Sequence, residues 1–117
     1  MHIEQLREYC LAKKGVEETF PFGEDTLVFK VMGKMFAVTS LSEPVSVNLK
    51  CNPEKAIELR ASFEAVKPGY HMNKIHWNTI SYNEDVSDKL ILELIDHSYQ
   101  LVVSSLTKKL QQELNSL

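Results

Sequence analysis

The sequence predicts a single α+β domain with two layers, in which a mainly antiparallel sheet carries helices on one face. Its 117 residues, 44% hydrophobic and 25% charged, have the size and composition of one globular domain with a single core. Stretches with strand-like alternation of apolar and polar residues are separated by stretches with the three-and-four spacing of helices. Their order is helix, three strands, helix, two strands, helix. We assign the domain to residues 1–105 and treat residues 106–117 as a C-terminal tail.

The first half of the chain predicts one helix followed by three strands. Ile3, Leu6 and Cys10 mark the apolar side of a helix that Gly15 would close. Residues 26–32 and 35–39 are rich in β-branched and aromatic residues, and the turn at Gly33 between them predicts a hairpin. The strict alternation at 45–50 is typical of a strand that is buried on one face only.

The second half predicts a helix, a pair of strands and a long final helix. Asn52 can cap a helix that runs to about residue 62, because Pro53 suits the first helical position. Strands at 63–67 and 77–82 are expected to pair across the turn at Pro68 and Gly69. The last helix should begin near residues 85–87, since apolar residues recur from there at helical spacing.

The tail at 106–117 leaves two interpretations open. Leu106, Leu110, Leu114 and Leu117 recur at roughly helical spacing, but polar residues interrupt the pattern. The tail is therefore either a helical extension, packed on the body or on a partner, or a frayed terminus.

Composition and motifs exclude several classes of function. No stretch has the apolar length of a secretory signal or a membrane span, so we expect a cytoplasmic protein without a membrane partner. Cys10 and Cys51 match no metal-binding spacing and are expected to be reduced, buried residues. The chain has no phosphate-binding glycine loop, GxSxG or HExxH motif. His71 and His76 are five residues apart and would point to opposite sides of an extended segment. We therefore predict no enzymatic activity, no metal and no cofactor.

Charge is distributed unevenly along the chain. The net charge is −3, and residues 1–25 and 83–117 each contain three basic and six acidic side chains. Residues 26–82 contain seven basic and four acidic side chains. Within this part, residues 67–78 include no acid and offer two lysines, two histidines, two asparagines and two large aromatic residues. A local cationic surface is therefore expected in a protein that is acidic overall.

The composition of residues 67–78 is typical of a nucleic-acid surface. Lysine attracts phosphates, asparagine can bond to base edges or backbone oxygens, and tyrosine or tryptophan can stack on a base. The candidate binding residues are Lys67, Tyr70, His71, Asn73, Lys74, His76, Trp77 and Asn78. The alternative interpretation is structural: Trp77 and Met72 fill the core, Tyr70 and the asparagines satisfy turn backbone, and the lysines are solvated.

Three segments carry a resemblance to a known family. Residues 68–79 (PGYHMNKIHWNT) resemble the signature of the MmcQ/YjbR family of small bacterial proteins. Thr19-Phe20-Pro21-Phe22-Gly23, together with residues 26–31 and 33–37, resembles its amino-terminal signature, and residues 98–102 also fit. The sequence departs from the pattern at Ile75, where a second lysine is common, and at Thr107, where proline is frequent.

The resemblance implies a two-layer fold similar to that of secretion chaperones, described as a double-wing arrangement. It also implies a DNA-binding protein, with no enzymatic activity or cofactor attached to the family. Three hypotheses about function follow. The first is a DNA-binding module that uses residues 67–78. The second is a protein-interaction module that engages a partner or a second copy through the tail or a sheet edge. The third is a binder of a small anionic ligand, with Lys67, Lys74 and His76 in the pocket wall.

Overall fold

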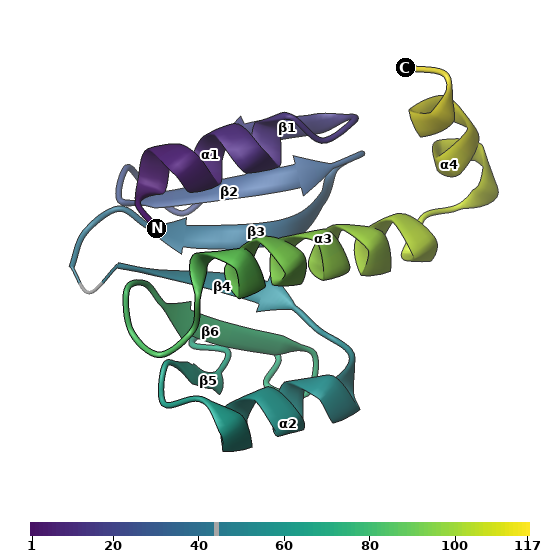
Figure 1. Cartoon of the computed structure of the whole chain (residues 1–117). Coiled ribbons are helices and arrows are strands. Elements are labelled where there is room, and N and C mark those ends of the chain that lie inside the picture. Colours follow the sequence, from purple (N-terminus) through teal and green to yellow (C-terminus); the bar gives the residue numbers. More distant parts are fainter. Residues whose placement is uncertain (44) are drawn as a thin grey trace.

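A computed structural model describes residues 1–43 and 45–117 (Figure 1). The six strands form one antiparallel sheet in the order β1-β2-β3-β4-β6-β5. In chain order the elements are α1 (Ile3–Leu11), β1 (Val16–Thr19), β2 (Thr26–Val31), β3 (Lys34–Ser40), β4 (Ser46–Lys50), α2 (Pro53–Ser62), β5 (Val66–Pro68), β6 (Trp77–Ser81), α3 (Asp88–Ser105) and α4 (Lys108–Asn115).

The helices cover one face of the sheet, which confirms the predicted α+β class. Helices α1 and α3 lie across the same face, and α2 lies beside β6 and β5 at the end of that layer (Figure 1). The paired residues Ala37 and Leu49, and next to them Val47 and Ile80, belong to the apolar core under the helices. Tyr99 of α3 meets Phe36 edge-on, with ring centroids 5.4 Å apart. Apolar burial between these two layers is the main stabilising contribution.

The structure differs from the prediction in the number of strands before α2. Strand β1 is an additional edge strand that pairs with β2. Its four residues, Val-Glu-Glu-Thr, lack an alternating pattern, so sequence periodicity did not identify it. The hairpin between β2 and β3 is confirmed. Both Met32 and Gly33 have positive φ angles, 49° and 85°, as expected for the type I′ turns that match the twist of strands.

The C-terminal tail is helical and packs on the same chain. Thr107 caps α4 by accepting a hydrogen bond from the amide of Leu110. Leu106 and Leu114 are buried and belong to the core. Leu114 lies so close to Gly15 that a side chain at this glycine would collide with it.

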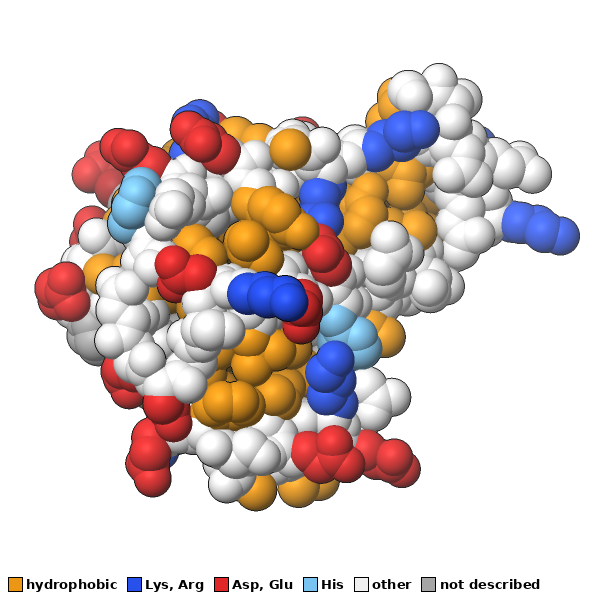
Figure 2. Space-filling model, viewed as in Figure 1, with side chains coloured by type: hydrophobic (Ala, Val, Ile, Leu, Met, Phe, Trp, Pro, Cys, Tyr) orange, Lys and Arg blue, Asp and Glu red, His pale blue; other side chains and the backbone are white. Residues whose placement is uncertain are grey.

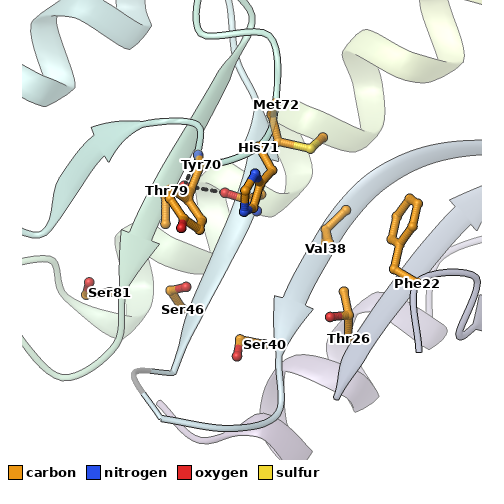
Figure 3. Close-up of a pocket in the computed structure, with 11 residues that line it drawn as sticks. Phe22, Thr26, Val38, Ser40, Ser46, Tyr70, His71, Met72, Thr79 and Ser81 are labelled. Carbon is orange, nitrogen blue, oxygen red and sulfur yellow. Dashed lines mark hydrogen bonds between the residues drawn. The ribbon is translucent and has the colours of Figure 1, made fainter. Parts of the chain in front are cut away.

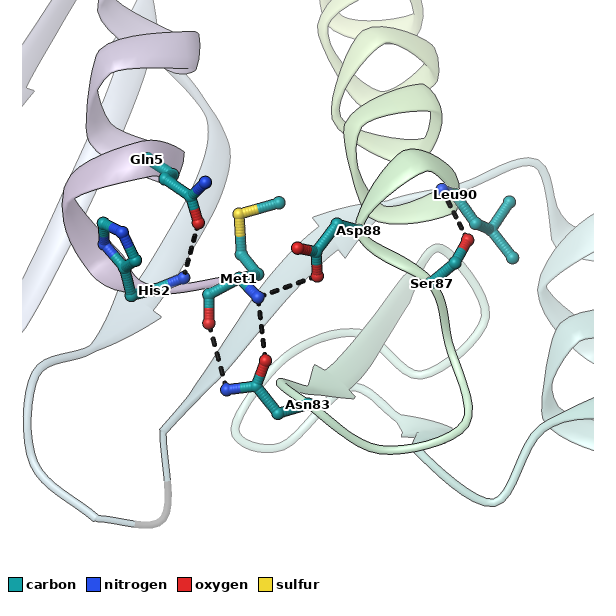
Figure 4. Close-up of polar contacts among 7 residues, drawn as sticks. All are labelled: Met1, His2, Gln5, Asn83, Ser87, Asp88 and Leu90. Carbon is teal, nitrogen blue, oxygen red and sulfur yellow. Dashed lines mark hydrogen bonds and ion pairs between the residues drawn. The ribbon is translucent and has the colours of Figure 1, made fainter.

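The amino terminus is bound to the connection between β6 and α3 (Figure 4). The ammonium group of Met1 donates to Asn83 Oδ1 at 2.8 Å and to Asp88 Oδ1 at 2.7 Å. The Asn83 side chain in turn donates to the Met1 carbonyl at 3.1 Å. In the described part of the chain, no helix combines the length and apolarity needed to cross a bilayer.

Ser98 connects α3 to two strands of the sheet. Its hydroxyl donates to the Phe36 carbonyl at 2.6 Å and accepts from the Lys50 amide at 2.9 Å. These two backbone groups flank the end of the β3–β4 ladder, where the last pair is Ala37 with Leu49. The fully buried serine therefore completes backbone hydrogen bonding that the strands do not complete themselves.

Replacing Ser98 with alanine is expected to lower the free energy of unfolding by about 1–3 kcal/mol, because the Phe36 carbonyl would lose its buried donor. Urea denaturation measures the change. Ser104→Ala gains the same helix propensity at an exposed position of α3 and should remain within about 0.5 kcal/mol of the parent. Equal effects of the two substitutions would contradict the bridging role.

His97 on α3 provides a second link, to the start of α2. The Asn52 amide donates to His97 Nε2 at 3.2 Å, which requires this nitrogen to be unprotonated. Burial, with a smaller contribution from Lys55, lowers the pKa of His97. The unfolded chain therefore takes up this proton more readily than the folded chain.

Because the folded pKa of His97 lies below its unfolded value, its contribution to stability is complete above about pH 6.5 and is lost as pH falls through the folded pKa. Urea midpoints at about pH 7.5 and about pH 5.5 bracket this change. His97→Gln retains an acceptor that does not titrate, so it should reduce the loss of stability in acid. His76→Gln, at an exposed position, should not. A His97→Gln variant with the full parental loss would disprove this assignment.

Candidate nucleic-acid interface

The face of the sheet opposite the helices carries polar side chains on β4, β6 and β5 and valines on β3 and β2. The register places Lys67, Thr79, Asn48, Val38, Val28 and Thr19 in one row across all six strands. Because side chains alternate along a strand, residues two positions away share this face. The neighbouring pairs Ser46–Ser81 and Thr26–Ser40 therefore add hydroxyl groups to it. We call this surface the open face.

A groove of about 780 Å³ lies on the open face (Figure 3). Phe22 stands on one side, and Tyr70, His71 and Met72 stand on the other, with Val38 between them. The complete lining consists of Phe22, Thr26, Val38, Ser40, Ser46, Asn48, Tyr70, His71, Met72, Thr79 and Ser81. No lysine, arginine, aspartate or glutamate is among these residues, so the groove itself favours neutral chemical groups.

The wall formed by Tyr70 and His71 belongs to the loop that joins β5 to β6, residues 69–76. The two rings contact each other, with centroids 4.0 Å apart and planes inclined at 52°. His71 has a positive φ of 59°, which is uncommon for a residue other than glycine. The Tyr70 amide donates to Thr79 Oγ1 at 2.9 Å, and the Thr79 hydroxyl donates to Asn48 Oδ1. The wall is thus hydrogen-bonded to two strands of the groove floor.

Arg60, near the end of α2, fixes the other end of this loop. Its Nε donates to Asn78 Oδ1 at 2.6 Å. Its Nη2 donates to the carbonyls of Lys74 and, at 3.3 Å, of Trp77. One guanidinium group therefore joins the helix, strand β6 and the loop, as its planar set of donors allows.

Six of the eight predicted binding residues are exposed on β5 and the loop. They are Lys67, Tyr70, His71, Asn73, Lys74 and His76. Two of them also have local contacts: Asn73 Oδ1 accepts from the Ile75 amide at 2.9 Å, and Lys74 Nζ donates to the Gly69 carbonyl at 3.1 Å. The sequence thus identified a segment whose polar and aromatic groups lie together at the surface.

Trp77 and Asn78 correct the prediction, because both are buried. Asn78 is 1% exposed and donates to the Ala56 carbonyl while accepting from Arg60. Trp77 is 9% exposed and lies beneath the loop, where its Cβ is 2.8 Å from the position of a Cβ added to Gly69. Neither side chain is available to a nucleotide, and for Trp77 only an anchoring role remains.

The sequence did not identify Arg60 or the groove floor. The floor could have been anticipated from Ser46, Asn48 and Lys50, which are the polar positions of an alternating strand. No sequence signal distinguishes Arg60 from an ordinary solvated arginine, since its role depends on the tertiary approach of β6 to α2.

On the helix-covered face, the described cations are mixed with acidic side chains. Figure 2 shows lysine and arginine side chains among aspartate and glutamate side chains on that face, without a continuous basic patch. Two of its cations are engaged in ion pairs, Arg7 with Glu18 at 2.6 Å and Lys13 with Asp96. The open face joins a groove without lysine, arginine, aspartate or glutamate to an acid-free loop.

Replacing Arg60 with alanine is expected to accelerate amide hydrogen exchange in the loop by about 10- to 100-fold. Charge-assisted hydrogen bonds contribute roughly 1.5–3 kcal/mol, and the substitution removes three of them from one site. The amides to follow are those of Gly69, bonded to the Trp77 carbonyl, and Trp77, bonded to the Asn73 carbonyl. Arg7→Ala removes an arginine whose partner lies elsewhere and should leave both rates unchanged. Unchanged exchange rates in Arg60→Ala would refute the role of Arg60 in holding the loop.

Known proteins with similar sequences span nearly the whole chain. The uncharacterized protein YbdF of Escherichia coli O157:H7 is 38% identical over 110 residues, which cover 93% of this chain and 90% of YbdF. The uncharacterized protein YjbR of Escherichia coli K12 is 36% identical over 110 residues, which cover 93% of this chain and 93% of YjbR.

Solved structures agree with the fold. The crystal structure of Deinococcus radiodurans protein DR2400, of domain family DUF419, superposes with a TM-score of 0.90 at 39% identity, covering 96% of this chain and 86% of that one. A crystal structure of a Pseudomonas syringae protein gives a TM-score of 0.76 at 28% identity, covering 86% of this chain and 98% of that one. The family model named YjbR matches residues 11–101. The chain therefore belongs to the YjbR family.

Proposed function

We propose that this protein binds DNA, without catalysis, through the β5–β6 loop and the adjacent open face. The observation that carries the proposal is the joint exposure of Lys67, Lys74, His71 and His76 on β5 and the β5–β6 loop, where His71 also lines the groove. Lysines supply salt-dependent attraction to phosphates, and the exposed ring of Tyr70 offers a surface for stacking. The resemblance stated from the sequence points to the same class of ligand.

The positive charge of residues 67–78 is balanced by few acidic side chains. Within residues 1–43 and 45–117, its one ion pair joins Lys67 to Glu64 at 3.9 Å. The side chains of this pair are 65% and 92% exposed, so the attraction between them is weak in water. Lys50 adds a further cation on the open face, opposite Trp77 in the register. A phosphate approaching this side meets more positive than negative charge, although the protein is acidic overall.

The two other hypotheses have less support from the geometry. The tail places Leu106 and Leu114 in the core of its own chain, which leaves less apolar surface for a partner. A small anionic ligand would need a charged wall, and neither lysine of the segment nor His76 lines the groove. DNA binding is the hypothesis that uses both the exposed cations and the groove.

Fluorescence anisotropy with labelled single-stranded and duplex DNA tests the proposal. Binding should weaken steeply between about 50 and 200 mM salt, because neutralised phosphates release counterions. The double variant Lys67→Gln/Lys74→Gln should bind more weakly, and for a single strand its log–log salt slope should fall by about 1.4, the value for two lost phosphate contacts.

The matched control is Lys108→Gln/Lys109→Gln, which changes the net charge equally at the exposed start of α4. It should retain the parental salt slope. Absent or salt-independent binding, or an equal loss in the control, would overturn the proposal. A near-ultraviolet circular dichroism spectrum checks that Lys74→Gln, which removes a donor to the Gly69 carbonyl, leaves the loop folded.

A further inference from the structure

The groove differs chemically from the cations around it. Its lining has hydroxyl, amide, imidazole, aromatic and thioether groups but no lysine, arginine, aspartate or glutamate. A phosphate placed there would lose water without meeting a lysine or arginine, which is unfavourable. A flat, uncharged ring with polar edges would lose little by entering, since serine, threonine and asparagine side chains can both donate and accept hydrogen bonds.

The walls of the groove are exposed rings. Phe22 is 63% and Tyr70 is 69% exposed, although both are large apolar side chains that a fold normally covers. They stand on opposite sides of the floor, with His71 beside Tyr70 (Figure 3). Rings in this position can pack against the faces of a planar heterocycle.

Two lysines lie next to the groove floor on the open face, one in the same row of the sheet and one further along β4. Lys67 is paired with Thr79 of the floor, one strand further out. Lys50 follows Asn48 of the floor by two residues on the same face of β4. Positive charge at the rim and a neutral, ring-walled interior match the two parts of a nucleotide in a strand: its charged phosphate and its uncharged base.

We infer that the groove binds an unpaired base of a single strand whose phosphates lie along Lys67 and Lys50. This inference rests on the proposed function. In a duplex the bases are stacked and paired, so only an unpaired or extruded base can enter a groove of this kind. Hydroxyl groups that both donate and accept discriminate poorly between bases, so the preference is for unpaired structure and not for a particular sequence.

The test compares three labelled DNA ligands of about 12 nucleotides by fluorescence anisotropy: oligothymidylate, an abasic strand with the same number of phosphates, and a duplex. Stacking contributes about 1–3 kcal/mol per base, so oligothymidylate should bind about 5- to 150-fold more tightly than the abasic strand. It should also bind more tightly than the duplex at the same salt concentration.

Two variants locate the effect in the groove. Ser46→Phe fills the floor without a change in charge, and it should reduce the affinity for oligothymidylate to that for the abasic strand. Tyr70→Ala removes an exposed ring from one wall and leaves the core intact. It should reduce the affinity for oligothymidylate about tenfold. Neither variant should change abasic binding more than about twofold. Ser62→Phe, at an exposed end of α2, is the control and should match the parent.

The outcomes separate this inference from the proposed function. Equal binding of oligothymidylate and the abasic strand, or tighter binding of the duplex, would overturn the base site and leave phosphate binding intact. Parental oligothymidylate binding by Ser46→Phe would do the same. Absence of binding to all three ligands would overturn both proposals.

Discussion

Burial of the sheet on one side only determines the character of the rest of the molecule. Helices α1, α2 and α3 gather on one face, so the apolar positions of each strand must point there, as Val47 and Leu49 do. The intervening positions of the same strand, Ser46 and Asn48, must then face water. A six-stranded sheet built in this way has a second face that the helices do not cover, and the loop between β5 and β6 turns part of that face into a groove. The candidate site is thus a consequence of how the core is built.

The loop is held in place by hydrogen bonds and packing from the rest of the domain. Arg60 joins it to α2, Trp77 supports it from below, and Gly69 allows its backbone to approach the Cβ and carbonyl oxygen of Trp77. The Tyr70 amide is fixed to the sheet through Thr79. A surface that is ordered in advance loses less conformational entropy when it binds, so exposed rings and cations on such a loop can contribute more of their interaction energy to affinity.

The sequence was sufficient for the fold class and for the exposure of most of the candidate segment, but not for the roles of individual residues. The strand at 45–50 and helix α3 could be predicted because their apolar residues recur in a pattern that is local in the sequence. Tertiary contacts bury the same residues and so agree with that pattern. Trp77 and Asn78 were predicted to contact the ligand because composition does not reveal which face of β6 each occupies or what covers it. Arg60 and Ser98 were missed because their partners are backbone and side-chain groups distant in sequence. The acid-free loop was identified because local charge, unlike burial, can be read directly from the residues.

The central claim is that the open face and the β5–β6 loop, and not the helix layer, form the binding surface. Backbone chemical-shift mapping of the isotopically labelled protein with a short single-stranded oligonucleotide tests it most directly, because it reports every described strand and helix in one experiment. The account predicts that shift changes concentrate at Asn48, Thr79 and residues 67–76, and that the amides of α1 and α3 remain unaffected. Changes confined to the helices, or spread evenly over both faces, would contradict it.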